Sequence, residues 1–153
     1  MPLAIRTSAF ADGKTIPAKY TRDGDNVSPP LAWFGTPAGT RSFALIVEDP
    51  DAPNGTFYHW AMFNIPADRD GLSEGIGDSA SGGAKFAIND FGNIGYDGPD
   101  PPIGHGTHHY HFRLAALDVP ALPLSERSKV TDVWREASKH ALATAEVVGT
   151  YER

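Results

Sequence analysis

Histidine is the residue type in this chain whose placement most clearly suggests chemistry. Four of the six histidines fall within seven positions, namely His105, His108, His109 and His111. If residues 108–117 form a strand, His108 and Tyr110 face one side of it, and His109 and His111 face the other. A four-histidine metal cluster is therefore not expected. His105 and His108 remain a candidate ligand pair, but zinc needs three or four convergent ligands, so we expect no metal and no cofactor.

Two histidines and an aspartate stand where short apolar segments meet loops rich in proline and glycine. Asp49 closes the segment 42–49, while His59 and His108 each open a later one. Residues at such strand ends, framed by rigid loops, commonly line concave sites. One aspartate, two imidazoles and the Tyr110 hydroxyl would make a small polar pocket. The alternative is that Asp49 only caps its own turn, as aspartate before proline often does; the residues alone leave both interpretations open.

Motifs for nucleophilic or nucleotide chemistry are weak or absent from the sequence. Asp49, a histidine and Ser42 or Ser28 could form a triad on paper, but no G-x-S-x-G elbow precedes a helix. Neither G-x-x-x-x-G-K-S/T nor G-x-G-x-x-G occurs, so phosphate-cradling loops of those types are not expected. A weak hydrolase with Asp49, His59 and His108 as acid and base is kept as an alternative, although no convincing nucleophile accompanies them.

Composition and charge exclude several classes of protein. The chain has 153 residues, with 13 Lys and Arg against 19 Asp and Glu, which gives a net charge of −6. One domain over residues 1–153 is expected at this length. An acidic chain without a basic face does not suit nucleic acid, and no stretch nears the roughly 20 apolar residues of a membrane span. Cysteine is absent, and the amino terminus lacks a signal-peptide pattern, so we expect a cytoplasmic protein.

Short apolar segments separated by turn residues indicate a mainly β protein. Strands are predicted at residues 42–49, 59–65, 108–117 and 145–151. A flexible loop is expected over 71–83. Apolar residues from Val130 to Leu142 recur at the spacing of one helix face, and Ser128 or Thr131 could cap that helix. Because helices do not alternate with the strands, an antiparallel β-sandwich with one short helix near the C-terminus is expected rather than βαβ units.

Several motifs combine into a family pattern that spans essentially the whole chain. The strongest are Asp49-Pro-Asp-Ala-Pro53, His59-Trp60, the loop Tyr96–Gly106 (YDGPDPPIGHG) and His108-His-Tyr110. Three further stretches agree with it: residues 26–33 (NVSPPLAW), 89–92 (NDFG) and 147–151 (VVGTY). Together they resemble the phosphatidylethanolamine-binding protein family, and within it the short bacterial branch of Raf-kinase-inhibitor-like proteins of the YbhB/YbcL type.

The resemblance implies an antiparallel β-sandwich with a small anion-binding pocket at one end. In family members that pocket accepts phosphate-like or carboxylate-like groups, including phospholipid headgroups and phosphorylated side chains. By position, the ligand-binding residues here would be Asp49, Asp51, Pro53, His59, Asp100, Pro101, His108 and Tyr110. The implied function is non-catalytic capture of such ligands, which modulates a partner. Some members inhibit a protein kinase or a serine protease, which is the alternative, and the short bacterial relatives suggest a homodimer.

Departures from the family pattern affect the expected pocket. Many relatives have arginine or lysine where this chain has His109, and eukaryotic relatives have glycine where it has Asp100; the long C-terminal helix of animal members is shortened or relocated. Because neither pocket motif contains Lys or Arg, protonated His59 or His108 and backbone N–H groups must supply positive charge for an anion. Asp49 beside one of these rings would raise the pKa of that ring. We therefore expect anion binding to strengthen as the pH falls through roughly 6.5.

Overall fold

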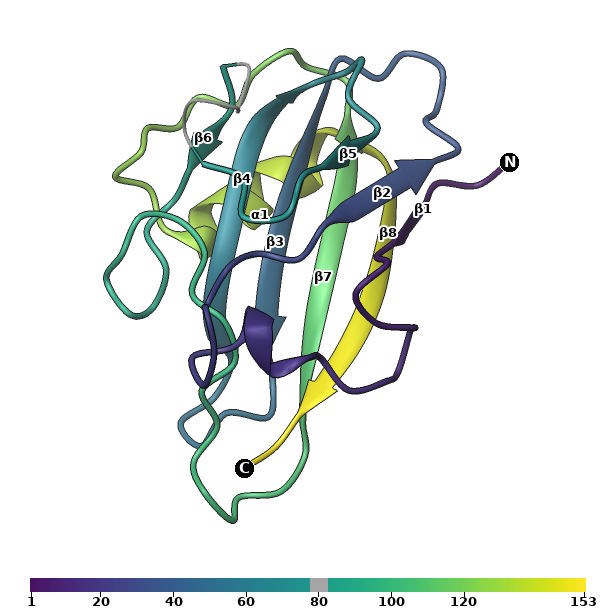
Figure 1. Ribbon diagram of the computed structural model, residues 1–153. Coiled ribbons are helices and arrows are strands. Elements are labelled where there is room, and N and C mark those ends of the chain that lie inside the picture. Colours follow the sequence, from purple (N-terminus) through teal and green to yellow (C-terminus); the bar gives the residue numbers. More distant parts are fainter. Residues whose placement is uncertain (78–82) are drawn as a thin grey trace.

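The computed structural model describes residues 1–77 and 83–153 and shows a mainly β architecture (Figure 1). In chain order the elements are β1 (Ala4–Arg6), η1 (Ala18–Tyr20), β2 (Leu31–Phe34), β3 (Ser42–Asp49), β4 (Phe57–Pro66), β5 (Gly71–Leu72), β6 (Lys85–Phe86), β7 (His108–Leu117), α1 (Val130–His140) and β8 (Ala141–Tyr151). η1 is a short 3-10 helix, and α1 is an α-helix of 11 residues. The long strands β3, β4, β7 and β8 therefore carry most of the regular structure.

The strands form two antiparallel sheets, and the helix makes a third layer. The smaller sheet has the order β1-β2-β5, and the larger sheet has the order β6-β4-β3-β7-β8. In Figure 1 the smaller sheet crosses one face of the larger sheet, and α1 lies against the other face. β3 is the central strand, because it pairs with β4 on one side and β7 on the other. The expected antiparallel β-sandwich with one helix is confirmed.

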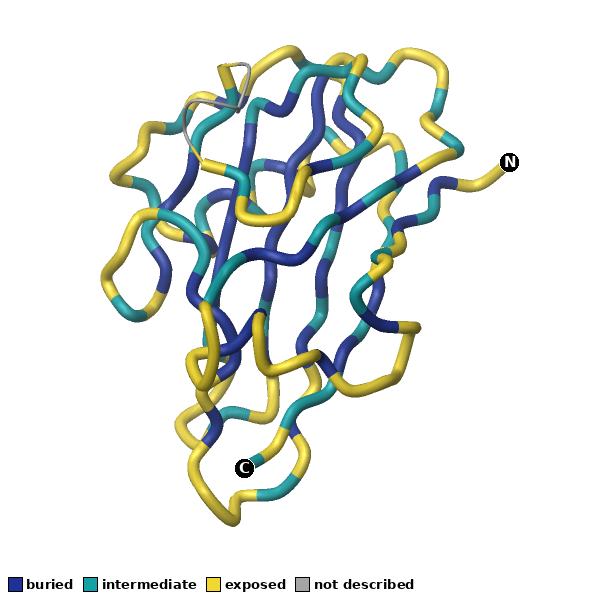
Figure 2. The backbone as a smooth tube through the Cα atoms, viewed as in Figure 1, coloured by how far each residue is buried: buried dark blue, intermediate teal, exposed yellow. Residues whose placement is uncertain are grey.

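Two apolar clusters cover the two faces of the larger sheet. One fills the space between the sheets and includes Trp33, Phe43 and Trp60, and the other lies under α1 and includes Phe63 and Val133. β3 is buried almost continuously, because a strand covered on both faces must be apolar on both. Figure 2 shows the buried backbone concentrated in these central strands and the exposed backbone in the loops at both ends.

The sequence predictions for the longest strands hold, with corrections near the C-terminus. Strands predicted at 42–49 and 108–117 are β3 and β7, and the strand predicted at 59–65 extends to Phe57–Pro66. The predicted helix is too long, because α1 ends at His140 and β8 begins at once. Ala141 pairs with Leu117 of β7, and this sheet pairing overrides the helical spacing that continues to residue 142.

The start of α1 and the long predicted loop also differ from expectation. Lys129 occupies the N-cap position without a side-chain cap, and the Asp132 carboxylate accepts the Lys129 N–H at 3.0 Å. The predicted caps, Ser128 and Thr131, are therefore wrong. Residues 71–72 of the predicted 71–83 loop form β5, and residues 78–82 lie outside the described residues. Within the part of the chain that is described, no helix has the length and apolar character needed to cross a membrane.

The directions of the strands bring three distant parts of the chain to one end of the larger sheet. β3 ends at Asp49, which pairs with Phe57 at the start of β4. β7 runs antiparallel to β3, so its first residues lie beside the same end. Figure 1 shows this end at the bottom of the view, where the loop between β3 and β4 and the loop before β7 extend past the strands. The segments that carry the predicted pocket motifs are thus adjacent.

Candidate functional site

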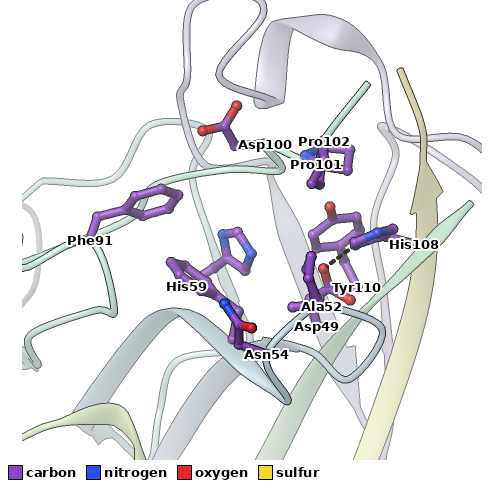
Figure 3. A pocket seen from close by; sticks show the side chains of 12 residues that line it. Asp49, Ala52, Asn54, His59, Phe91, Asp100, Pro101, Pro102, His108 and Tyr110 are labelled. Carbon is purple, nitrogen blue, oxygen red and sulfur yellow. Dashed lines mark hydrogen bonds and ion pairs between the residues drawn. The ribbon is translucent and has the colours of Figure 1, made fainter. Parts of the chain in front are cut away.

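A cavity of about 230 Å³ lies between the loops at this end of the larger sheet. Figure 3 shows Asp100, Pro101 and Pro102 along one side of it, with Ala52 and Asn54 on the opposite side. Seven of the eight residues predicted from the family resemblance line it, and Asp51 does not. The lining residues are Asp49, Ala52, Pro53, Asn54, Phe57, His59, Phe91, Asp100, Pro101, Pro102, His108 and Tyr110.

Asp49 and His108 form a buried pair on the cavity wall. Oδ2 of Asp49 lies 2.6 Å from Nδ1 of His108, and both side chains are less than 5% exposed (Figure 3). The other carboxylate oxygen accepts the backbone N–H of Asp51 at 2.8 Å. The two interpretations left open by the sequence are both present, because Asp49 caps its own turn and also lines the pocket. Its negative charge is matched by donors on both oxygens.

A β-bulge places His59 in the cavity. Its neighbours Tyr58 and Trp60 pair with consecutive residues of β3, so His59 is the extra residue of β4, and bulges of this kind redirect a side chain. Nδ1 of His59 donates to the Asp97 carbonyl at 2.9 Å. Burial lowers the pKa of His59 below its ordinary value. This direction argues against His59 as the source of positive charge that the sequence analysis allowed for.

The loop before β7 is fastened to the rest of the fold through Asp97. The Asp97 carboxylate accepts hydrogen bonds from the side-chain amides of Asn26, Asn89 and Asn93 and pairs with Arg22. Burial acts to raise the pKa of Asp97, but these hydrogen bonds outweigh burial and hold the pKa below its ordinary value. Two of the asparagines, Asn26 and Asn89, belong to the NVSPPLAW and NDFG motifs, and these two side chains position the loop rather than line the cavity.

Gly98 and Tyr96 hold the same loop against η1. A Cβ at Gly98 would lie 2.1 Å from the Tyr20 carbonyl oxygen, a separation that no side chain tolerates, so the close approach requires glycine. The Tyr96 hydroxyl donates to that same carbonyl at 2.6 Å. The loop that carries Asp100 and Pro101 is therefore a packed part of the structure before any ligand arrives.

Tyr110 brings a hydroxyl that has no hydrogen-bond partner within the described residues. The residue is 1% exposed, and Figure 3 shows its ring between those of His59 and His108. The Tyr110 ring lies edge-on to His59, with centroids 5.3 Å apart, and nearly parallel to His108 at 6.4 Å. Burial raises the pKa of Tyr110, so the hydroxyl keeps its proton. Buried polar groups nearly always have a partner, and a ligand in the cavity would supply one.

Asp100 on the cavity wall is paired with two arginines from distant parts of the chain. Its Oδ1 lies 2.5 Å from Nη1 of Arg153, and its Oδ2 lies 3.6 Å from Nε of Arg22. The Arg22 guanidinium also covers the Phe91 ring at 4.4 Å, and Arg153 is held by Asp23 as well. Sequence reasoning missed both arginines, because neither belongs to a pocket motif and no local pattern connects them with Asp100.

The structure separates Asp51 from the cavity and adds aromatic residues to its wall. Oδ2 of Asp51 accepts the backbone N–H and the ring Nδ1 of His109, both at 2.8 Å, on the exposed surface. Phe57 and Phe91 line the cavity and meet edge-on with centroids 4.7 Å apart. Phe91 stands inside the NDFG motif, which was the available signal for it. Phe57 was missed because the predicted strand began two residues too late.

His105 contacts His108 without lining the cavity. Nδ1 of His105 lies 2.6 Å from Nε2 of His108, so the candidate ligand pair of the sequence analysis is a hydrogen-bonded pair. In the described ranges 1–77 and 83–153, no group of three or more His, Asp or Glu side chains is arranged to hold a metal ion. With Asp49 on the other nitrogen, both ring nitrogens of His108 are engaged by the protein.

Fold and site together define a small antiparallel β-sandwich with a preformed cavity of Asp, His and Tyr side chains at its strand ends. The family model described as phosphatidylethanolamine-binding protein matches residues 6–152 of the chain. The chain belongs to this family. The prediction drawn from the DPDAP, HW and YDGPDPPIGHG motifs is thereby confirmed.

Individual relatives agree over the whole length. A UPF0098 protein of Methanothermobacter thermautotrophicus is 44% identical over 151 residues, which cover 97% of this chain and 98% of the relative. The UPF0098 protein YbhB of Escherichia coli is 38% identical over 158 residues, covering 97% of this chain and 99% of YbhB. The crystal structure of Escherichia coli YbcL superposes with a TM-score of 0.95 at 34% identity, covering 100% of this chain and 99% of YbcL.

Proposed function

We propose that this protein captures a small ligand bearing a phosphate or carboxylate group in the cavity, without catalysing a reaction, and thereby modulates a partner. The observation that supports this most is the meeting of Asp49, His59, His108 and Tyr110 in one cavity at the ends of three strands. Binding sites commonly combine apolar walls with a few convergent polar groups of this kind. Tyr110 has the unpaired hydroxyl that an anionic oxygen would accept a hydrogen bond from.

Both carboxylates on the cavity wall have hydrogen-bond or ion-pair partners within the protein, so an anion can bind beside them. Asp49 is bound by His108 and by a backbone N–H. Asp100 faces Arg153 and Arg22. Neither carboxylate is therefore an uncompensated negative charge, even though the whole chain is acidic. The remaining donors are neutral: the Tyr110 hydroxyl and the exposed Asn54 amide.

The shape of the cavity favours a small anionic group attached to an apolar or aromatic body. A volume of about 230 Å³ is below the ~300–1,000 Å³ of pockets that take drug-sized ligands. Pro53, Pro101 and the edge-on pair of Phe57 and Phe91 form apolar wall. Because prolines and the Asp97 hydrogen bonds already order the loops, little further ordering entropy is lost on binding.

Binding without turnover is favoured by what the lining residues cannot do. Among the described residues that line the cavity, there is no serine, threonine, cysteine or lysine. The Tyr110 phenol is a poor nucleophile, because burial raises its pKa, and both nitrogens of His108 are occupied. The weak hydrolase, the kinase or protease inhibitor, the homodimer and the cytoplasmic location stay predictions.

Isothermal titration with phenyl phosphate tests the proposal, with phenol as the neutral analogue. We expect saturable binding of one phenyl phosphate per chain and none of phenol, because the polar groups are arranged for an anionic oxygen. Ala52→Phe fills the cavity and should abolish the signal, whereas Ala11→Phe on the exposed N-terminal segment should not. Binding that survives Ala52→Phe unchanged, or equal binding of phenol, would contradict the proposal.

A further inference from the structure

An edge-on contact with His105 connects the buried His108 ring to the protein surface. The facing nitrogens are 2.6 Å apart, the ring centroids are 4.8 Å apart and the ring planes are inclined at 63°, so the rings meet through their nitrogen atoms. His108 is 1% exposed, whereas His105 is exposed. Since Asp49 holds the opposite nitrogen of His108, the three side chains run from a buried carboxylate to the solvent.

The facing ring nitrogens of His105 and His108 limit how many protons the pair can hold between the rings. Only one proton fits between two ring nitrogens at hydrogen-bond distance. In the neutral pair that proton belongs to Nδ1 of His105, because Nδ1 of His108 already donates to Asp49. Nε2 of His105 then carries no proton and, within the described residues, contacts no hydrogen-bond partner. It is the atom of the pair that is open to protonation from water.

An added proton can therefore charge His108 without entering the cavity. The proton binds Nε2 of His105, and the central proton moves from Nδ1 of His105 to Nε2 of His108. His105 is then neutral with its proton on Nε2, and His108 is an imidazolium ion. Only N–H bonds form and break in these steps, and the net change is the gain of one proton from water.

Two carboxylates and two tyrosines lie around the His108 ring. Asp49 binds it directly, and the Asp51 carboxylate interacts with it electrostatically. Its neighbour on β8 is Tyr151, whose hydroxyl is bound to Asp23. The Tyr110 ring, which carries a neutral hydroxyl, lies nearly parallel to the His108 ring, and Asp100 and Arg153, which are paired with each other, interact electrostatically with Tyr110. An anion in the cavity would add a further negative charge near the same ring and favour its protonation.

We propose that His105 is a positioning residue of the anion site and the entry point for the proton that His108 takes up when an anion binds. The inference rests on the proposed function, because it describes how that cavity acquires positive charge. It explains why neither nitrogen of His108 is left for a ligand, since the ring supplies charge while Tyr110 supplies the hydrogen bond. It also assigns a role to an exposed histidine outside the cavity.

Calorimetric titration with benzoate, whose charge is constant from about pH 6 to 8.5, measures the coupling. The number of protons taken up follows from binding heats in buffers of different ionisation enthalpy. At pH values above the midpoint for protonation of the His105–His108 pair in the free protein, we expect the wild type to take up close to one proton per benzoate bound. In that range its affinity for benzoate should fall about tenfold per pH unit. His105→Leu, which covers His108 without a nitrogen, should bind benzoate with little proton uptake and a flat pH profile.

Two further variants distinguish proton transfer through His105 from a merely structural role of this residue. His105→Gln can donate to neutral His108 and, with its amide rotated, accept from the imidazolium, so we expect it to restore part of the pH dependence. His140→Leu, at the opposite end of the larger sheet, should keep the wild-type proton count. Wild-type proton uptake in the His105→Leu variant overturns the inference. If the wild-type protein binds benzoate without taking up a proton, the inference about His105 is overturned and the proposed function is not. If the wild-type protein binds neither benzoate nor phenyl phosphate, the proposed function is overturned as well.

Discussion

Asp49 and His108 meet at 2.6 Å between Oδ2 and Nδ1, from strand ends that are 59 residues apart in the chain. Their side chains are 4% and 2% exposed, so water contributes little to satisfying either group. Removing one partner of a buried pair leaves the other without compensation, which costs more than the pair itself contributes. The contact therefore ties the β3–β4 loop to β7 and forms one wall of the cavity at the same time.

His108→Ala should lower the free energy of unfolding by about 3–5 kcal/mol, because it leaves the buried Asp49 carboxylate without its donor. Asp49→Ala together with His108→Ala should cost less than the sum of the two single changes. Urea unfolding followed by circular dichroism measures all three. The exposed pair of Asp51 and His109 is the matched control, and His109→Ala should cost less than about 1 kcal/mol. Additive losses for the buried pair would contradict this account.

Tyr110→Phe should weaken phenyl phosphate binding while leaving stability nearly unchanged. The hydroxyl has no partner among the described residues, so the folded protein loses no hydrogen bond. A hydrogen bond to a charged group contributes about 1.5–3 kcal/mol, so affinity should fall by about 10-fold to 100-fold. Titration calorimetry measures it. Tyr58→Phe, which lies against the helix-side core, is the control, and an equal loss in both variants would show that the Tyr110 hydroxyl is not the contact.

Because the pKa of His59 is lowered in the folded protein, the free energy of unfolding depends on pH. The unfolded chain binds the proton at an ordinary pKa of about 6.5, while the folded protein binds it only at lower pH. The stability associated with the neutral ring is therefore present above about pH 6.5 and is lost as the pH falls toward the lowered folded pKa. Urea unfolding of wild type and His59→Gln across this range should show a stability gap that shrinks on acidification. A gap that is constant with pH contradicts the direction.

Asp100→Asn should strengthen anion binding about fivefold. The carboxylate is a negative charge on the cavity wall, and its removal leaves Arg22 and Arg153 with one carboxylate partner each, Asp97 and Asp23. A Coulomb term of about 1 kcal/mol is expected for charges several ångströms apart in a partly solvated site. Phenyl phosphate titration measures it, with Asp118→Asn at the far end of β7 as the control. Weaker binding in Asp100→Asn would mean that loop order outweighs charge.

The sequence predicted the parts of this site that depend on local pattern. The apolar run of β3, which ends before Pro50, and the aromatic run of β7 predicted that Asp49 and His108 lie at strand ends. The family motifs added Pro53, Asp100 and Pro101 to the predicted site. The bulge that turns His59 could not be predicted, because it depends on the register between two strands. The arginine pair on Asp100 likewise depends on how the segment after η1 and the end of β8 pack.

The end of α1 and the contact between His105 and His108 could not be predicted either, because both depend on tertiary packing rather than on local sequence pattern. The apolar spacing after Val130 predicted a helix, but its end at His140 follows from the pairing of Ala141 with β7. His105 was considered only as a metal ligand, because spacing cannot show that its ring meets His108 edge-on. Such a contact follows from the path of the Gly104–Gly106 loop, which no periodicity describes.

Mapping phenyl phosphate onto the isotope-labelled protein by nuclear magnetic resonance tests the central claim most directly. Backbone and histidine-ring signals would be followed during the titration until saturation. We predict saturable shifts concentrated at the β3–β4 loop, the loop before β7, and the rings of His59 and His108. Shifts that do not saturate, or that centre on the surface around Arg6 and Pro30 at another depression of the molecule, would contradict the cavity as the anion site.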